Sequence, residues 1–125
     1  RDRGHSDSRS LMQSDCIFCD IASGEVAADF VQRDSYCVAV NDIAPAAPIH
    51  VLVIPVKHFT YLEHMTSDFS PILFRMFEVA RDVAYSAGIS NSGYRLVINQ
   101  KDDSGQEIPH LHLHILGGNK LGSMV

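Results

Sequence analysis

The sequence predicts a single α+β domain built on a mostly antiparallel, five-stranded sheet. The chain has 125 residues, 46% of them hydrophobic and 20% charged, which is enough for one core without disulfides. Five short runs rich in β-branched and aromatic residues read as strands, and only residues 70–87 repeat apolar side chains every three or four positions. The resulting order is a short helix, three strands, a long helix and two strands, which favours helices packed on an antiparallel sheet.

Each element has its own local signal. Ile17, Phe18 and Ile21 predict a short helix that Gly24 ends in a left-handed conformation. Ser70 is expected to cap the long helix, with Pro71 at its first position and Gly88 after its last turn. The predicted strands are 30–32, 36–40, 50–55, 94–99 and 110–116.

Composition excludes several function classes. Residues 1–14 are rich in Ser, Arg and Asp with no hydrophobic period, so we expect a disordered arm or expression remnant, followed by one domain at 15–125. The net charge of −5 argues against general nucleic-acid binding but leaves room for a site that holds one nucleotide. No apolar run approaches the roughly 18 residues of a membrane span. Three cysteines and no secretion-type leader favour a reducing, cytoplasmic location.

The most informative segment is 110–116, which reads HLHLHIL. On a strand, His110, His112 and His114 would share one face over roughly 13 Å while the apolar residues between them face the core. The simplest interpretation is a polar strand face without a function, but three alternating histidines favour chemistry. Histidines at this spacing can chelate a metal or present a neutral imidazole as a nucleophile. The loop Gly105, Gln106 and Glu107 favours the nucleophile, because its backbone N–H groups can hold anionic oxygens.

The cysteines give a weaker signal. Cys16 and Cys19 form a C-x2-C pair at the start of the short helix, which suits a metal site, a redox dithiol or coincidence equally well. Zinc would need two further ligands, which histidines can supply. Cys37 lies within a strand and is expected to be a small buried hydrophobe.

The sequence GQEIPHLHLHILGG, preceded by YRLVIN and by NDIAPAAPIHVLVIPVKHF, resembles the histidine triad (HIT) superfamily, specifically its nucleotide-binding branch. The resemblance extends from Cys16 to about Leu121. It implies a HIT-like fold whose sheet continues across a homodimer. It further implies a hydrolase that converts purine nucleoside 5′-phosphoramidates to the nucleoside monophosphate and an amine through a nucleotidylated histidine.

The resemblance also implies roles for individual residues. His112 matches the nucleophile, and His114 and His50 match its catalytic neighbours. The positions that match the substrate-binding set are Asn99, Gly105, Gln106, Glu107, Asp42, Ile43, Val40, Ile17, Phe18 and Ile21. The positions that match a structural zinc site, with one ion per chain, are Cys16, Cys19, His58 and His110.

Three departures from the family pattern affect specificity. Pro109 replaces an aromatic residue, Asn41 stands where some relatives have His, and the chain lacks a Trp-Pro-Pro-Gly ending. Leaving-group preference is therefore open.

Four other functions remain to be separated from the phosphoramidase. They are a non-catalytic purine-nucleotide-binding protein, a dinucleoside-polyphosphate hydrolase, a nucleotidyl transferase, and a zinc hydrolase that uses His110, His112 and Glu107.

Overall fold

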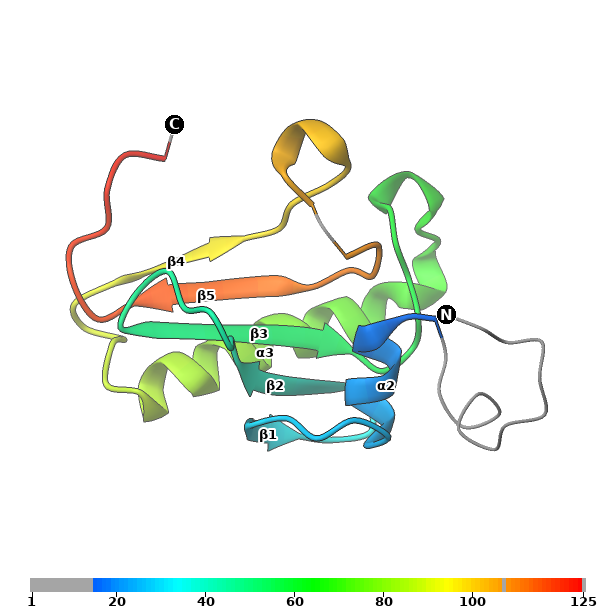
Figure 1. Cartoon of the computed structure of the whole chain (residues 1–125), viewed down its shortest axis with the longest axis horizontal. Coiled ribbons are helices and arrows are strands. Elements are labelled where there is room, and N and C mark those ends of the chain that lie inside the picture. The colour runs from blue at the N-terminus through cyan, green and yellow to red at the C-terminus, as the bar shows by residue number, and fades with distance from the viewer. Residues whose placement is uncertain (1–14, 107, 125) are drawn as a thin grey trace.

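The computed structural model describes residues 15–106 and 108–124, and its centre is a five-stranded sheet (Figure 1). The strand order is β1-β2-β3-β5-β4, and every neighbouring pair is antiparallel. The predicted α+β class and five-stranded antiparallel sheet are therefore confirmed. The strands are β1 (Phe30–Arg33), β2 (Cys37–Asn41), β3 (Ile49–Pro55), β4 (Tyr94–Val97) and β5 (Leu113–Gly117). The expected arm at 1–14 lies outside the described residues.

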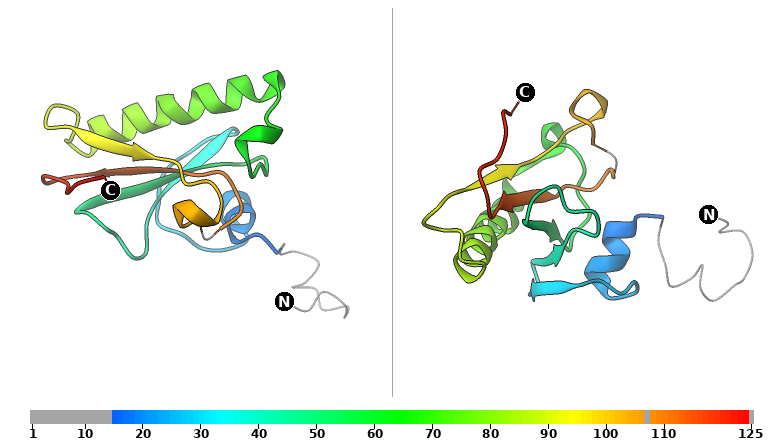
Figure 2. Two further views of the ribbon diagram at one scale, coloured as in Figure 1. Left: turned by 90° about the horizontal axis from the view of Figure 1, so that it is seen from above. Right: turned by 60° about the vertical axis from the view of Figure 1, so that its left-hand side comes forward.

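Within residues 15–106 and 108–124, two α-helices lie on opposite faces of the sheet (Figure 2). The short helix α2 (Ile17–Ser23) ends at Gly24, whose φ of 90° is the left-handed conformation predicted for it. The long helix α3 (Ser70–Ser86) stops at Ala87, and Gly88 follows with φ 76°. The described part of the chain also contains three single-turn 3-10 helices: η1 (Leu62–His64), η2 (Ser67–Phe69) and η3 (Asp102–Ser104).

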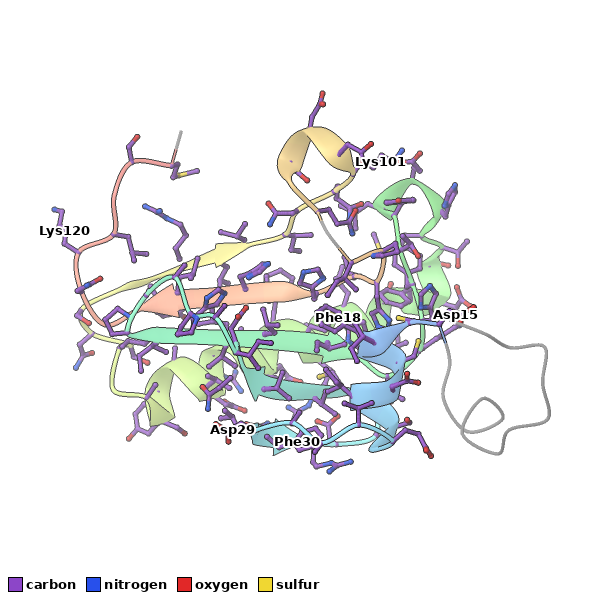
Figure 3. The ribbon with its side chains drawn as sticks, in the orientation of Figure 1. Asp15, Phe18, Asp29, Phe30, Lys101 and Lys120 are labelled. Atoms are coloured by element: carbon purple, nitrogen blue, oxygen red, sulfur yellow. The ribbon has the colours of Figure 1, made fainter. Side chains whose placement is uncertain are left out.

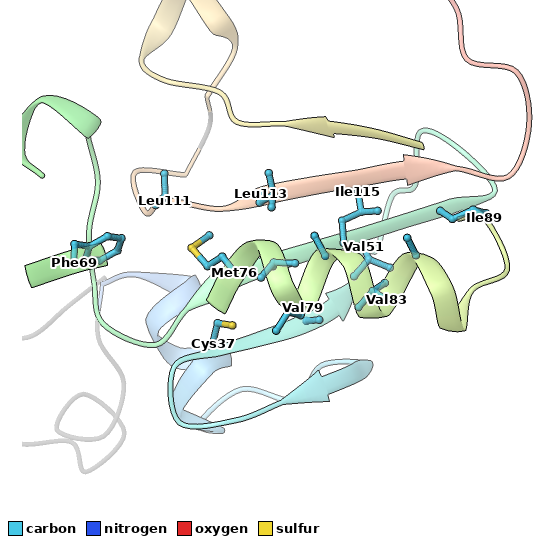
Figure 4. Close-up of a cluster of buried hydrophobic side chains, with 14 residues drawn as sticks. Cys37, Val51, Phe69, Met76, Val79, Val83, Ile89, Leu111, Leu113 and Ile115 are labelled. Atoms are coloured by element: carbon cyan, nitrogen blue, oxygen red, sulfur yellow. The ribbon is translucent and has the colours of Figure 1, made fainter. Parts of the chain in front are cut away.

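The central strands are buried on both faces, as their continuous apolar runs predict. In β2, Cys37 and Ala39 belong to the core under α3, whereas Val38 and Val40 belong to the core under α2. The same alternation in β3 and β5 places Val51, Val53, Leu113 and Ile115 against α3 (Figure 4). The opposite face of β5, which carries histidine, is therefore the α2 face.

The fifth strand begins at Leu113, so the prediction that it begins at His110 is wrong. Val53 pairs with Leu113, and continuing that register would place Leu111 opposite Pro55. A proline has no N–H for the ladder, so the pairing ends there. The Leu111 N–H instead donates to the Phe59 carbonyl. The backbone of the first half of the histidine run is thus bonded to the segment that follows β3, rather than to a ladder of the sheet. The prediction that the fourth strand reaches Asn99 is also wrong, because β4 ends at Val97.

Ser70 does not cap α3, which corrects a third expectation. It has helical φ and ψ of −54° and −45°, because η2 leads directly into α3. Its hydroxyl donates to the Ser67 carbonyl at 2.7 Å, so the serine satisfies the preceding turn instead of the N-terminus of α3. Pro71 remains in the first turn, where its missing N–H costs nothing.

Candidate active site and metal cluster

His112 lies just before β5, next to His114, with ring centroids 5.0 Å apart. The ring of Phe18, on α2, meets His112 edge-on at 4.8 Å and His110 at 6.0 Å. Figure 3 labels Phe18 on the ribbon of α2. The prediction that the three histidines lie on one side, opposite the buried leucines, is confirmed.

A single hydrogen bond fixes the tautomer of the His112 ring. Its Nδ1 lies 2.7 Å from the backbone carbonyl oxygen of His110. A carbonyl only accepts, so Nδ1 carries the proton and Nε2 keeps its lone pair. Burial lowers the pKa of His112, which is 7% exposed, and this keeps the imidazole neutral near pH 7. His112 is thus a neutral imidazole with a fixed tautomer and a nucleophilic Nε2.

A hydrogen-bonded chain runs beside His112. The Ala46 N–H donates to His50 Nδ1 at 3.0 Å, so the His50 proton is on Nε2. That Nε2–H lies 2.9 Å from His114 Nδ1 and 3.5 Å from Asp42 Oδ2. His114 therefore accepts at Nδ1 and carries its own proton on Nε2. Burial is the main cause that lowers the pKa of His114 to about 4, so this histidine is a neutral donor near pH 7.

The geometry of the sheet produces this contact. His50 is paired with Leu116, and His114 is two residues before Leu116, so the two histidines are diagonal neighbours on one face. Asp42 follows β2, and its Oδ1 accepts from the Ala44 N–H at 2.8 Å. The expected catalytic pair His50 and His114 and the carboxylate of Asp42 are thus brought together.

The loop after β4 presents a polar donor. Gln106 accepts the Lys101 N–H at its Oε1, at 2.7 Å, while its Nε2 is buried and has no hydrogen-bond partner among the described residues. Lys101 has φ 68° and ψ −174°, a strained backbone conformation that is rare outside glycine. An ion pair of 2.6 Å to Glu63 holds the Lys101 side chain (Figure 3 labels Lys101). Gln106 therefore offers a pre-positioned amide N–H, which suits an anionic oxygen.

The other residues predicted to bind substrate differ in burial and in their place in the fold. Phe18, Ile21 and Val40 join one apolar cluster under α2. Ile43 is fully exposed, and Ile17 is 43% exposed. Gly105 has φ 86° and ends η3, and Asn99 is half-buried two residues after β4. Glu107 lies outside the described residues.

Cys16, Cys19, His58 and His110 form a compact cluster whose four ligand atoms all lie within 4.8 Å of one another. His110 Nδ1 is 3.2 Å from Cys16 Sγ and 3.2 Å from His58 Nδ1, and Cys19 Sγ is 3.3 Å from His58 Nδ1. The four residues come from the start of α2, from the segment after β3 and from the segment before β5. We refer to these four residues as the Cys2His2 cluster.

The outer contacts of the two histidines test whether this cluster fits a metal ion. His110 Nε2 donates to the Pro55 carbonyl at 2.9 Å, so its Nδ1 lone pair faces the centre. His58 Nε2 lies 3.1 Å from the hydroxyl oxygen of Thr60. That hydroxyl donates its own hydrogen bond to the Pro109 carbonyl. His58 is therefore the donor to Thr60, and its Nδ1 lone pair also faces the centre. Two sulfurs and two imidazole nitrogens are a donor set suited to closed tetrahedral zinc.

The two imidazole nitrogens that face this centre carry no proton, so a proton that a cation would displace is on a sulfur atom. Burial and the neighbouring Cys16 thiol raise the pKa of Cys19 to about 12, so without a cation that thiol keeps its proton. A metal ion displaces such protons when it binds. The Cys2His2 cluster is thus complementary to a cation in both its lone pairs and its exchangeable protons.

Asp42, His50 and His114 form a second group whose ligand atoms also lie within 4.8 Å. Here His50 Nε2 carries a proton, because the Ala46 N–H occupies Nδ1. That nitrogen has no lone pair to offer a metal, so His50 and His114 form a hydrogen-bonded pair with the Asp42 carboxylate beside it.

A family model described as the HIT domain matches residues 23–121. The chain belongs to the HIT domain family. Purine nucleoside phosphoramidase of Escherichia coli K12 is 38% identical over 114 residues, covering 91% of this HIT protein and 96% of the relative. Protein HitA of Neisseria gonorrhoeae is 41% identical over 102 residues, covering 82% and 94% of the two chains.

Solved structures agree with this membership. A HIT family hydrolase from Legionella pneumophila has a TM-score of 0.84 and 42% identity, covering 86% of this chain and 96% of its own. A histidine triad protein from Clostridium difficile has a TM-score of 0.85 and 39% identity, covering 90% and 98%. The HIT fold and a HIT-family nucleotide hydrolase are therefore supported together. Among the described residues, no helix is both long and apolar enough to cross a membrane.

Sequence reasoning missed the residues that set the histidine tautomers. Thr60, the Ala46 N–H and the Pro55 carbonyl do so for His58, His50 and His110 respectively. Two of these groups are backbone atoms, which carry no residue-type signal. Thr60 was detectable only through its position, two residues after a predicted ligand in an irregular segment.

Proposed function

We propose that this HIT protein hydrolyses purine nucleoside 5′-phosphoramidates to the nucleoside monophosphate and an amine. The observation that carries the proposal is the 2.7 Å hydrogen bond from His112 Nδ1 to the His110 carbonyl, which leaves Nε2 as the nucleophile. The name of the Escherichia coli relative supports the same substrate class.

The reaction proceeds in two displacements. The Nε2 lone pair of His112 forms a bond to the α-phosphorus as the P–N bond to the amine breaks. The bonding electrons stay with the amine nitrogen, which takes up a proton. Water then attacks the same phosphorus, the bond to His112 breaks, the water gives up a proton, and the neutral imidazole is restored with the monophosphate released.

The neighbouring groups bind and orient the phosphate. His114 carries its proton on Nε2, and Gln106 has an unpartnered amide N–H; both can donate to phosphoryl oxygens, where charge must be stabilised. His50 holds His114 in that tautomer. We assign further phosphate contacts to Asn99, Gly105 and Glu107, ribose contacts to Asp42, and purine contacts to Ile17, Phe18, Ile21, Val40 and Ile43.

We propose one structural zinc ion per chain, held by the Cys2His2 cluster. Because all four positions of a tetrahedral ion are filled by protein, zinc there would supply structural cross-linking and no open site for substrate. Both ring nitrogens of His110 are engaged, Nε2 with the Pro55 carbonyl and Nδ1 with Cys16 of the Cys2His2 cluster, which argues against zinc hydrolysis through His110 and His112.

We further propose a cytoplasmic homodimer. Phe74, Phe77 and Tyr85 on the outer face of α3 are 68%, 44% and 78% exposed. An apolar helix face of this kind suits burial against a second copy. A monomer in sedimentation velocity at micromolar concentration would contradict the dimer. The three cysteines form no disulfide, which suits a reducing compartment.

Turnover on defined substrates tests the proposed activity. We expect wild-type protein to release AMP from adenosine 5′-phosphoramidate at a higher kcat/KM than from diadenosine polyphosphates. Tight binding of AMP without turnover would support a non-catalytic nucleotide-binding protein, and a preference for diadenosine polyphosphates would support the other hydrolase. Release of AMP only when a second nucleotide-accepting substrate is present would support a transferase.

A further inference from the structure

The segment that carries His110 and His112 precedes β5 and is held by the last residue of β3 and by the segment that follows β3. The Leu111 N–H donates to the Phe59 carbonyl, and His110 Nε2 donates to the Pro55 carbonyl. The third contact comes from Thr60, whose hydroxyl donates to the Pro109 carbonyl at 3.1 Å. These contacts replace the ladder bonds that end at Leu113. Together with the His110 N–H, which donates to the Ile108 carbonyl at 2.8 Å, they hold the backbone whose His110 carbonyl accepts from His112 Nδ1.

Thr60 contacts both the Cys2His2 cluster, at His58, and the backbone just before His110, at Pro109. A hydroxyl has one proton to donate, and the Pro109 carbonyl can only accept it. The hydroxyl oxygen is then the acceptor for His58 Nε2–H at 3.1 Å. One side chain thus sets the tautomer of His58 and anchors the residue immediately before His110.

We propose that Thr60 is a positioning residue that couples the Cys2His2 cluster to the nucleophile. Through His58 it keeps Nδ1 available to a metal ion, and through Pro109 it keeps the His110 carbonyl against His112. This inference rests on the proposed metal site and the proposed reaction. Outer partners of metal-bound histidines contribute in this way, and their loss costs about 10- to 100-fold in metal affinity or activity.

The first experiment measures metal binding. Thr60→Val keeps the shape of the side chain and removes the hydroxyl, and Thr60→Ser restores it. Thr66→Val is the matched control, because Thr66 is the other threonine of the chain, its hydroxyl donates to the Asp68 side chain, and the hydrogen bond from the Phe69 N–H to its backbone carbonyl survives the substitution. Competition with a chromogenic chelator should show that Thr60→Val weakens zinc binding about 10- to 100-fold, with Thr60→Ser and Thr66→Val near wild type.

A second readout needs no metal. Nitrogen-15 spectra of the histidine rings in the metal-free protein should show His58 protonated on Nε2 in the wild type and in Thr60→Ser. In Thr60→Val this preference should be lost. A purely structural role for Thr60 would not move the His58 tautomer in a variant that folds normally by circular dichroism.

The third readout tests the coupling to the nucleophile. In zinc-saturated Thr60→Val, kcat on adenosine 5′-phosphoramidate should fall about tenfold while KM stays near wild type. Unchanged zinc affinity and an unchanged tautomer in Thr60→Val would overturn the proposal while leaving the zinc site intact. A wild-type protein that binds no zinc would overturn both this proposal and the metal site. A wild-type protein that binds zinc but has no turnover would overturn the proposed function and the coupling, while the tautomer readout still decides the role of Thr60 at His58.

Discussion

The Cys2His2 cluster and the Asp42, His50 and His114 chain contain similar groups at similar spacing, yet they suit different chemistry. Both gather ligand atoms within 4.8 Å, and both lie at the histidine run. The difference is the position of the ring protons. The Pro55 carbonyl and the Thr60 hydroxyl accept hydrogen bonds from Nε2 of His110 and His58, so the Nδ1 lone pairs of those two rings face the centre of the cluster. Ala46 instead donates to His50, so that ring turns a proton inward.

This difference in tautomers, together with the two thiols of the first cluster, distinguishes a candidate metal site from a donor chain. In the first cluster every nitrogen at the centre is an acceptor that a cation can use. In the second, donor and acceptor alternate along the chain, and the free proton ends on His114. His112, the proposed nucleophile, lies between them and takes its tautomer from the backbone of a residue in the first cluster.

The largest expected effect comes from His112→Asn. Loss of the nucleophile should lower turnover of adenosine 5′-phosphoramidate by more than about a thousandfold, because the covalent step is removed. Steady-state kinetics measures the rate, and urea unfolding should show a fold close to wild type in stability. Retention of a larger fraction of the rate would assign the chemistry to another group.

Cys16→Ser and Cys19→Ser should remove the metal ion. Elemental analysis should fall from one zinc per chain to near zero, and loss of a saturating ion should cost about 4 kcal/mol in the free energy of unfolding. His114→Asn is the matched variant from the other group and should keep one zinc per chain. Loss of zinc in His114→Asn would contradict the distinction between the two groups.

A smaller effect is expected at His50. His50→Phe removes the donor to His114 Nδ1. Because one hydrogen bond contributes about 1 kcal/mol, kcat should fall about tenfold, and the zinc content should stay unchanged. Rapid-quench measurement of the first displacement would locate the effect. A rate equal to wild type would show that the tautomer of His114 does not matter to the reaction.

The smallest effects concern pH. Because the pKa of His112 is lowered, the acid limb of kcat/KM on adenosine 5′-phosphoramidate should have its midpoint below 6.5. A midpoint at or above 6.5 would contradict a buried, neutral nucleophile.

The pKa of His114 is about 4 in the folded protein and near 6.5 in the unfolded chain, so the unfolded state binds more protons between these values. The stability contributed by neutral His114 should be complete above pH 6.5. It should decline by up to about 1.4 kcal/mol per pH unit as the pH falls toward 4. Urea unfolding of His114→Asn should show a shallower decline, and equal slopes would contradict this assignment.

Much of the fold could be predicted because its signals are local. The apolar runs in β2 and β3, Gly24 after α2 and the spacing in α3 each depend on neighbouring residues. The start of β5 could not be predicted, because it depends on Pro55 standing opposite Leu111, 56 positions away in a register that only the folded sheet sets. Ser70 failed as a cap for a related reason, since η2 precedes α3 without a break.

The candidate site divides in the same way. The cysteine and histidine residue types indicated the chemistry, and the family resemblance indicated which residues to group. The hydrogen bonds that decide each histidine's proton come from Thr60 and from backbone atoms of distant segments. Such contacts depend on tertiary packing, so no motif in the sequence contains them.

The central claim is that His112 Nε2 forms a bond to phosphorus, and mass spectrometry of protein quenched during turnover tests it most directly. Digestion and fragment sequencing of the peptide that spans 110–116 should locate a nucleotide adduct on His112 in the wild type and no adduct in His112→Asn. An adduct on His114, or rapid turnover with no adduct on any histidine, would contradict the account.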